Sequence, residues 1–110
     1  MMKEVYVVNC CRTAIGSYGG SLKDTPAVEL GALVIKEALK RANVAPEHVD
    51  EVMFGCILTS ALGQNPARQA AVKAGVPLSA PAYTVGMVCG SGMKSVIEGG
   101  RAILSGDADI

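Results

Sequence analysis

One cysteine of this chain lies where a nucleophilic thiol is expected. Cys89 follows an apolar strand that ends in a turn of small residues, and a helix is predicted directly after the turn. A helix N-terminus carries partial positive charge and free backbone N–H groups, so it favours the thiolate over the thiol. Glycines on both sides of Ser91 leave room for a substrate to approach the sulfur. A buried and unreactive cysteine, the commoner case, fits the same position.

Few other side chains are candidates for chemistry. The only histidine, His48, lies in a polar turn, where a solvated surface residue is the more frequent outcome. Arg68 is a candidate substrate contact, although such an arginine more often forms an ion pair that holds a loop. The cysteines lack the C-x-x-C spacing of zinc sites and two are adjacent, so we expect no metal, no disulfide framework and reduced thiols. They are Cys10, Cys11, Cys56 and Cys89.

Composition excludes several classes of function. Half of the 110 residues are hydrophobic, and ten basic residues balance ten acidic ones, giving zero formal net charge. This balance is typical of a globular protein and gives no reason to expect nucleic acid or a membrane surface as partner. No apolar run approaches the roughly 20 residues that span a bilayer. The first residues resemble neither a signal peptide nor an Arg-rich presequence, so we expect a cytoplasmic location.

The elements around Cys89 are predicted from apolar spacing. Nearly continuous apolar runs at 5–10 and 52–58 are typical of strands buried on both faces, and a third strand is expected at 82–85. A fourth strand would begin at 109–110. Strands that alternate with helices indicate an α/β fold, with a mainly parallel sheet and helices on both faces.

Three helices separate these strands. The first is expected to begin at Pro26 with Thr25 as its cap, and its apolar stripe runs to residue 42. The second is expected from about 65 to 74, with Asn65 as the cap and Gly75 as the stop. The third follows Cys89, with apolar residues at three- and four-residue spacing, and ends at Gly106.

Four segments, in order and spanning almost the whole chain, match the motifs of one enzyme family. They are Cys11–Gly20, Leu62–Ala70, Val88–Ser95 and Gly106–Ile110. The first resembles an opening "RTP/A-x-G-x-F/Y-G-G", the second a "G-Q-N-P-A-R-Q" segment, the third a nucleophile motif, and the last a "G-D-A" that begins a strand. The chain thus resembles the thiolases, which are acetyl-CoA acetyltransferases and 3-ketoacyl-CoA thiolases.

The resemblance implies an acyltransferase of fatty acid metabolism with Cys89 as the catalytic residue. Cys89 would accept the acetyl group of acetyl-CoA, and a second acetyl-CoA would take it to form acetoacetyl-CoA, reversibly. Coenzyme A thioesters are then substrates, and no cofactor is implied. Members of the family are homodimers or homotetramers, and the strand at 82–85 would face another subunit.

The resemblance also implies parts that this sequence lacks. Thiolases activate the nucleophile with a histidine from a "G-H-P" segment and use a second cysteine in a "C-x-G-G-G" segment. Neither segment occurs here. We therefore expect residues 1–110 to be an incomplete N-terminal thiolase domain, part of one of the two similar α/β halves of the family. Alone, this chain is expected to have no measurable thiolase activity.

Two departures from the family pattern keep alternatives open. Gly86 stands where the family commonly has asparagine three residues before the cysteine, and Gly99 and Gly100 interrupt the helix after Cys89. Each glycine costs up to about 1 kcal/mol in a helix. One alternative is another acyltransferase of the same fold, such as a ketoacyl synthase. The other is a non-catalytic fragment, or half of a split protein.

Overall fold

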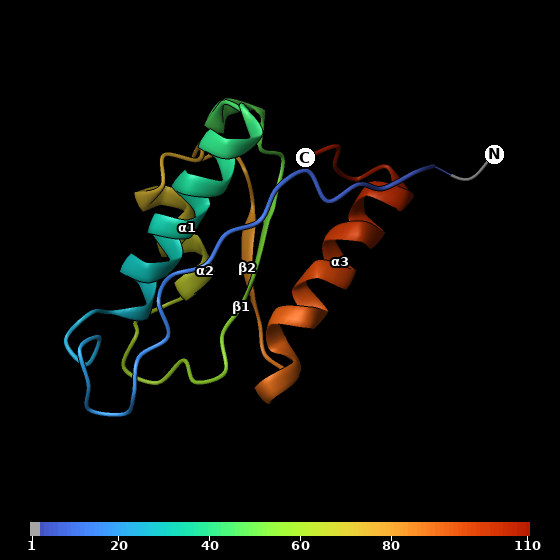
Figure 1. Ribbon diagram of the computed structural model, residues 1–110. Helices are drawn as coiled ribbons and strands as arrows, with labels where there is room; N and C mark the ends of the chain where they lie inside the picture. Colours follow the sequence, from blue (N-terminus) through green and yellow to red (C-terminus); the bar gives the residue numbers. More distant parts are fainter. Residues whose placement is uncertain (1–2) are drawn as a thin grey trace.

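The computed structural model describes residues 3–110 of the protein. Met1 and Met2, which the expected domain includes, lie outside the described residues. Three α-helices, two strands and two short 3₁₀ turns follow one another along the chain (Figure 1). Their order and bounds are α1 (Ala27–Ala42), η1 (Pro46–His48), β1 (Val52–Gly55), α2 (Pro66–Lys73), β2 (Ala82–Val85), η2 (Val88–Gly90) and α3 (Ser91–Ser105).

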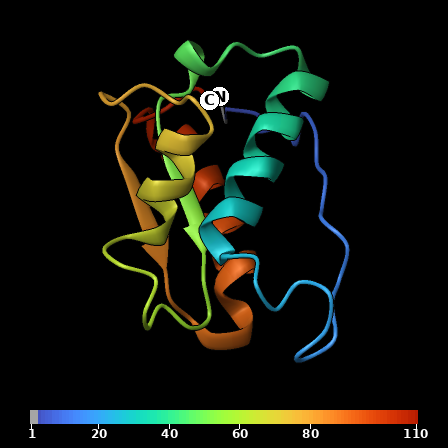
Figure 2. The ribbon, with the colours of Figure 1, turned by 90° about the vertical axis from the view of Figure 1, so that its left-hand side faces the viewer.

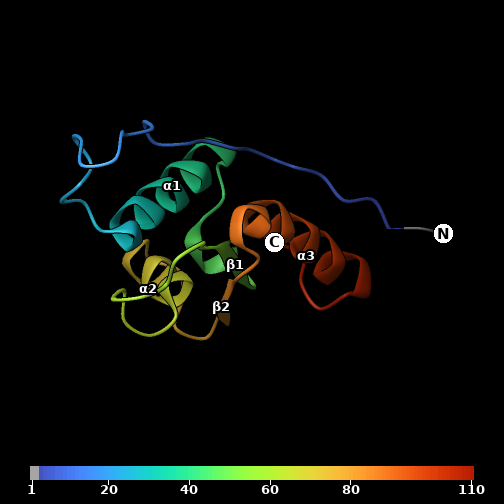
Figure 3. The ribbon, with the colours of Figure 1, turned by 90° about the horizontal axis from the view of Figure 1, so that it is seen from below.

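The two strands form a parallel pair with helices on both faces. Their register runs from Val52 opposite Ala82 to Gly55 opposite Val85. Helices α1 and α2 lie on one side of the strands and α3 on the other (Figure 3). Figure 2 looks onto the same layers from one side, with α1 and α2 in front of the strands and α3 behind them. The predicted α/β architecture is therefore confirmed.

Small residues allow the layers to approach closely. The inward face of α2 consists of alanines, of which Ala70 also meets α1 at Gly31. A Cβ on Gly31 would lie 3.1 Å from the Ala70 Cβ and 2.8 Å from the Phe54 Cε1. The core cluster beneath α2 then joins it to the sheet. Its buried members are Val52, Ala71, Val76 and Ala80.

The prediction of a strand at 5–10 is wrong. This segment is extended but belongs to no strand, and its Tyr6, Val7 and Val8 side chains are exposed. The apolar run shows that the segment is suited to burial, but a strand also needs a hydrogen-bonded partner, which the run cannot specify. Strand β1 is likewise shorter than the predicted 52–58, because the last bond of its ladder is Cys56 N–H to Val85 O at 3.1 Å.

Helix ends agree in part with the sequence. Asn65 caps α2 by accepting the Arg68 N–H at 3.1 Å, and Gly106 ends α3 in the left-handed conformation, as predicted. The predicted Thr25 cap is wrong, since Pro26 occupies the N-cap position of α1 and makes no side-chain bond. Proline has no side-chain oxygen, so Pro26 cannot accept a hydrogen bond from the free N–H groups of the first turn.

The end of the chain lies beside the start of β1. Ile110 O accepts the Asp50 N–H at 2.8 Å, and the Asp50 carboxylate accepts the N–H groups of Asp109 and Ile110 at 2.8 and 3.1 Å. These residues form no strand, but they lie next to the sheet at the point where the sequence predicts one.

Candidate active site

The predicted strand, turn and helix around Cys89 are present. Strand β2 ends at Val85, the chain turns through η2, and α3 begins at Ser91. Cys89 is exposed in the middle of η2, one residue before the cap of a 15-residue helix. Its backbone N–H donates no hydrogen bond to any group within residues 3–110. The thiol and one free N–H thus lie together at the positive end of α3.

The turn is closed by a side chain that sequence reasoning missed. Ser91 is only 2% exposed, and its hydroxyl accepts the Met87 N–H at 2.8 Å and donates to Val88 O at 2.7 Å. Gly90 N–H also bonds Met87 O at 2.9 Å. The position of a serine at a helix start is a signal for capping. Its two hydrogen bonds to the residues before the cysteine cannot be deduced from the sequence.

Strand β1 supports the turn from below. A Cβ on Gly55 would lie 2.5 Å from both the Gly92 N and the Ser91 carbonyl carbon, closer than atoms can pack. Only glycine lets the strand lie this close to the start of α3. The position of the Cys89 turn is therefore set by backbone contact with the sheet.

A second group of polar residues anchors α2 to β2, the strand that leads to Cys89. The Asn65 amide donates to Ala82 O at 2.9 Å, and its oxygen accepts the Thr84 hydroxyl at 2.9 Å. Thr84 Oγ1 in turn accepts the Ala67 N–H at 3.1 Å. This network ties the start of α2 directly to β2.

Arg68 holds a loop, but not through the ion pair that the sequence suggested. Its guanidinium donates to Ala80 O at 2.7 Å and to Leu78 O at 2.8 Å. Planar guanidinium groups suit two diverging carbonyls as well as a carboxylate. The next residue, Gln69, similarly donates to Leu62 O and Gln64 O at 2.7 and 2.9 Å. Both side chains thus serve the scaffold.

Comparison with known proteins identifies the lineage of this arrangement. The family described as thiolase, N-terminal domain, matches residues 5–110. The chain belongs to the thiolase family. It is 57% identical over 109 residues to an acetyl-CoA acetyltransferase of Cupriavidus necator, covering 99% of this chain and 28% of that relative. It is 53% identical over 106 residues to the cytosolic acetyl-CoA acetyltransferase of Mus musculus, covering 96% and 27%.

A solved thiolase has the same fold. The Acat5 thiolase from Ascaris suum, in a crystal structure with coenzyme A, superposes with a TM-score of 0.93 at 39% identity. The match covers 94% of this chain and 27% of that one. The thiolase chain described here thus spans about 28% of the length of the curated relatives it matches.

The remaining candidates of this thiolase domain lie away from the turn. His48 is exposed in η1, as the sequence suggested. All four cysteines are free thiols, and the Cys11 thiol donates to Val34 O at 3.3 Å. Within residues 3–110, no group of histidine, cysteine and acidic side chains is arranged to hold a metal ion. No helix in that part of the chain is long and apolar enough to cross a membrane.

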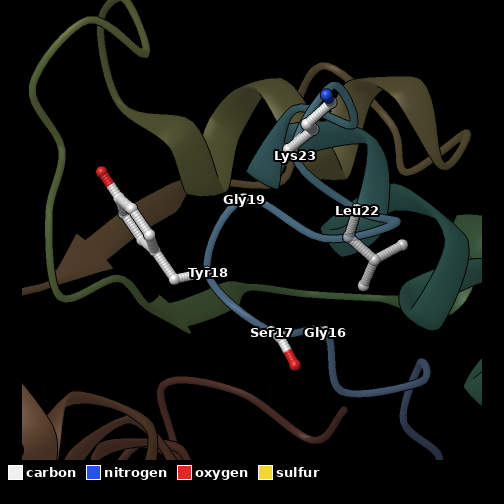
Figure 4. Close-up of a pocket in the computed structure, with 6 residues that line it drawn as sticks. All are labelled: Gly16, Ser17, Tyr18, Gly19, Leu22 and Lys23. Carbon is white, nitrogen blue, oxygen red and sulfur yellow. The ribbon is translucent and has the colours of Figure 1, made fainter.

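The thiolase-like opening loop forms a separate hollow. It is lined by Gly16, Ser17, Tyr18, Gly19, Leu22 and Lys23 (Figure 4). The Tyr18, Leu22 and Lys23 side chains point in different directions, and Tyr18 is fully exposed. Groups that bind a ligand converge on it, so this hollow shows no binding arrangement. Cys89 is not part of its lining.

Proposed function

We propose that this chain is the N-terminal portion of an acetyl-CoA acetyltransferase in which Cys89 carries the acetyl group. The observation that carries the proposal is the exposed Cys89 thiol at the start of α3, in a chain of the thiolase family. The names of its relatives, and the coenzyme A bound to the Ascaris suum thiolase, support coenzyme A thioesters as substrates.

The proposed reaction moves the acetyl group from the coenzyme A sulfur to the Cys89 sulfur and then to a carbon atom. The Cys89 thiolate attacks the carbonyl carbon of acetyl-CoA, the carbon–sulfur bond to coenzyme A breaks, and the coenzyme A thiolate leaves with the electron pair. A second acetyl-CoA, deprotonated at its methyl carbon, then attacks the acetyl carbon and releases Cys89 as acetoacetyl-CoA forms. Cysteine suits the first step because thioester exchange is nearly balanced, and it suits the second because the acyl-enzyme stays reactive and the thiolate is a good leaving group.

The helix start would also stabilise the transition state. Each attack places negative charge on the thioester oxygen, and a free backbone N–H at the nucleophile is a suitable donor for it. The Cys89 N–H is such a donor. Gly86 and Gly92 add no bulk beside the turn, since a Cβ on either would meet nothing within 4 Å.

The remaining catalytic groups belong to segments beyond this sequence. The thiolase resemblance implies a histidine that activates the nucleophile and a second cysteine that moves protons. Neither the "G-H-P" nor the "C-x-G-G-G" segment is among the 110 residues. We therefore expect the chain alone to lack turnover, because an activated nucleophile requires a base.

We also propose the assembly and location implied by the resemblance. A homodimer or homotetramer would pair through β2, which lies at one edge of the two-stranded sheet of the described residues. An edge strand presents unpaired backbone groups that another chain can bind. The cytoplasm is the proposed location, in line with the cytosolic relative of Mus musculus.

A hybrid enzyme tests the function directly. Residues 1–110 would replace the matching stretch of the Cupriavidus necator relative, and thiolysis of acetoacetyl-CoA by coenzyme A would be measured. We expect turnover, and we expect Cys89→Ala to lower it about 10³-fold or more, because the nucleophile is lost. The exposed Cys10→Ala is the matched control and should leave turnover unchanged.

Two results would contradict the proposal. Turnover that survives Cys89→Ala would show that this thiol is not the acyl carrier. A folded hybrid without turnover on acetoacetyl-CoA would favour an acyltransferase with other substrates or a non-catalytic chain.

A further inference from the structure

We propose that Ser91 is a positioning residue whose hydroxyl holds the turn that presents Cys89. The inference deepens the proposed function, because it rests on Cys89 as the nucleophile. The turn comprises five consecutive residues, 87–91, and Cys89 lies at its centre.

The Ser91 hydroxyl spans the turn. Ser91 Oγ accepts the Met87 N–H and donates to Val88 O, so it bonds both residues that precede Cys89. A hydroxyl has a single hydrogen, and Ser91 uses it within the turn. Because the side chain is also 2% exposed, it cannot donate to a substrate. Its role in acyl transfer must therefore act through the cysteine.

The same hydroxyl bonds to a residue whose backbone is strained. Val88 has a φ of +46°, in the left-handed region that β-branched residues avoid. Such a conformation is unfavourable and persists only where surrounding structure determines it. The group that Ser91 bonds on this residue is its carbonyl. The strained peptide is thus fixed by the serine.

Packing of the turn's own side chains contributes little to holding the turn in place. Met87 and Val88 are both exposed, so burial does not hold their backbone in place. The serine is held instead, since the Ser91–Gly92 backbone lies against Gly55 of β1. Ser91 therefore transmits the rigid position of the sheet to the exposed cysteine.

It follows that Ser91 sets where the Cys89 thiol and N–H point. Without the hydroxyl, Val88 would relax to negative φ, and the cysteine would turn away from the helix axis. Both the attack on the thioester and the N–H donation to its oxygen depend on that direction.

Alkylation of the 110-residue chain by iodoacetamide, followed by peptide mass spectrometry, tests the inference. In the wild type, Cys89 should react faster than Cys11 and Cys56, and faster than Cys89 of the same chain in urea. Ser91→Ala should slow Cys89 about fivefold to tenfold, which corresponds to a loss of about 1–1.4 kcal/mol. Cys11 and Cys56 should be unchanged.

A matched variant separates the turn from the helix. Ser95 donates to Gly92 O at 2.7 Å, the same bond three residues back that Ser91 makes, but it is only half-buried and does not bond to the cysteine turn. Ser95→Ala should leave the Cys89 rate within about twofold of the wild type. An equal loss in both variants would overturn the positioning role.

A double-mutant cycle with Val88→Gly provides a readout that a purely structural serine would not alter. Glycine adopts positive φ without strain, so Ser91→Ala should slow Cys89 by less than about twofold in the Val88→Gly background. The same slowing in both backgrounds would overturn the inference, as would a folded Ser91→Ala chain with wild-type reactivity. If Ser91→Ala unfolds the chain, the double variant decides: a folded chain supports the inference and an unfolded one refutes it.

The same data distinguish failure of the two proposals. A wild-type Cys89 that reacts no faster than in urea would refute the nucleophile and, with it, the positioning role. A fast wild-type Cys89 that is indifferent to Ser91→Ala would refute the positioning role alone.

Discussion

Helices α2 and α3 lie on opposite faces of the same two strands, yet they are buried very differently. The inward alanines of α2, Ala67, Ala70 and Ala71, are each 1% exposed. On α3, by contrast, Met93 is 75% and Val96 is 66% exposed. Both helices have an apolar stripe at helical spacing, so the stripe alone does not decide burial.

The difference arises from how each helix is held. Helix α2 is packed between α1 and the sheet, and a salt bridge of 2.6 Å from Lys73 to Glu29 also joins it to α1. Helix α3 packs on β1 with one face, where Gly55 lies against its start and a Cβ on Gly99 would lie 3.7 Å from the Met53 sulfur, and it is tied back after its end through Asp50. One helix is thus packed between two elements, while the other packs on the sheet with one face and leaves Met93 and Val96 exposed.

A lysine introduced into each helix should give the largest difference between them. Ala70→Lys places an ammonium group in the packed layer and should destabilise the fold by more than about 4 kcal/mol. Val96→Lys on α3 should change the free energy of unfolding by less than about 0.5 kcal/mol, because the side chain is already exposed. Urea denaturation followed by circular dichroism measures both. Equal effects would mean that α3 is as buried as α2.

The same glycine substitution should have opposite signs on the two sides. Gly31→Ala brings a Cβ to 3.1 Å from Ala70, and we expect a cost of about 1–2 kcal/mol. At Gly100 of α3 a Cβ meets nothing within 4 Å, so Gly100→Ala should stabilise the helix by about 0.5–1 kcal/mol. Thermal unfolding of the two variants checks the signs. Destabilisation by both would place an unseen neighbour against Gly100.

The anchor between α2 and β2 should contribute a smaller, measurable amount. Asn65→Ala removes the cap and the bonds to Ala82 and Thr84, and it leaves alanine at a φ of +46°. Asn43→Ala is the matched control, since Asn43 has a φ of 54° but its side chain forms no hydrogen bond within residues 3–110. The difference between the two in urea denaturation should be about 1–2 kcal/mol. No difference would mean that the bonds of Asn65 are not stabilising.

Local signals predicted much of this structure. Apolar spacing located all three helices, and residue type identified the Asn65 cap and the Gly106 stop. The missed features all depend on partners distant in sequence or on details of backbone geometry. The closeness of Gly55 to α3 is one, and the strand wrongly expected at 5–10 is another.

The candidate site divides in the same way. The turn that carries Cys89 was predictable from small residues between a strand and a helix. The two hydrogen bonds of the Ser91 hydroxyl could not be predicted, because they depend on the left-handed backbone of Val88, which a β-branched residue does not suggest. Arg68 shows that the type of residue indicates its capacity to hold a loop, and only the fold decides which groups it holds.

The smallest expected effect concerns the polar tie after α3. The N–H groups of Asp109 and Ile110 lower the pKa of the Asp50 carboxyl below its usual value. A carboxyl with a lowered folded pKa contributes stability above its unfolded pKa, about 3.9, and loses it as pH falls through the folded value. Stability should therefore decline below about pH 4 in the wild type, and less steeply in Asp50→Asn.

Urea denaturation of the two chains at neutral and acidic pH measures this difference, with Asp24→Asn as control. Asp24 is also exposed, but it accepts no hydrogen bond within the described residues, so its substitution should leave the acid dependence unchanged. If Asp50→Asn retains the full decline, the tie does not stabilise the fold, and α3 is held by its packing against Gly55 and Met53 of β1. A reduced decline would show that the tie at Asp50 adds to this packing and helps to fix the helix that begins beside Cys89.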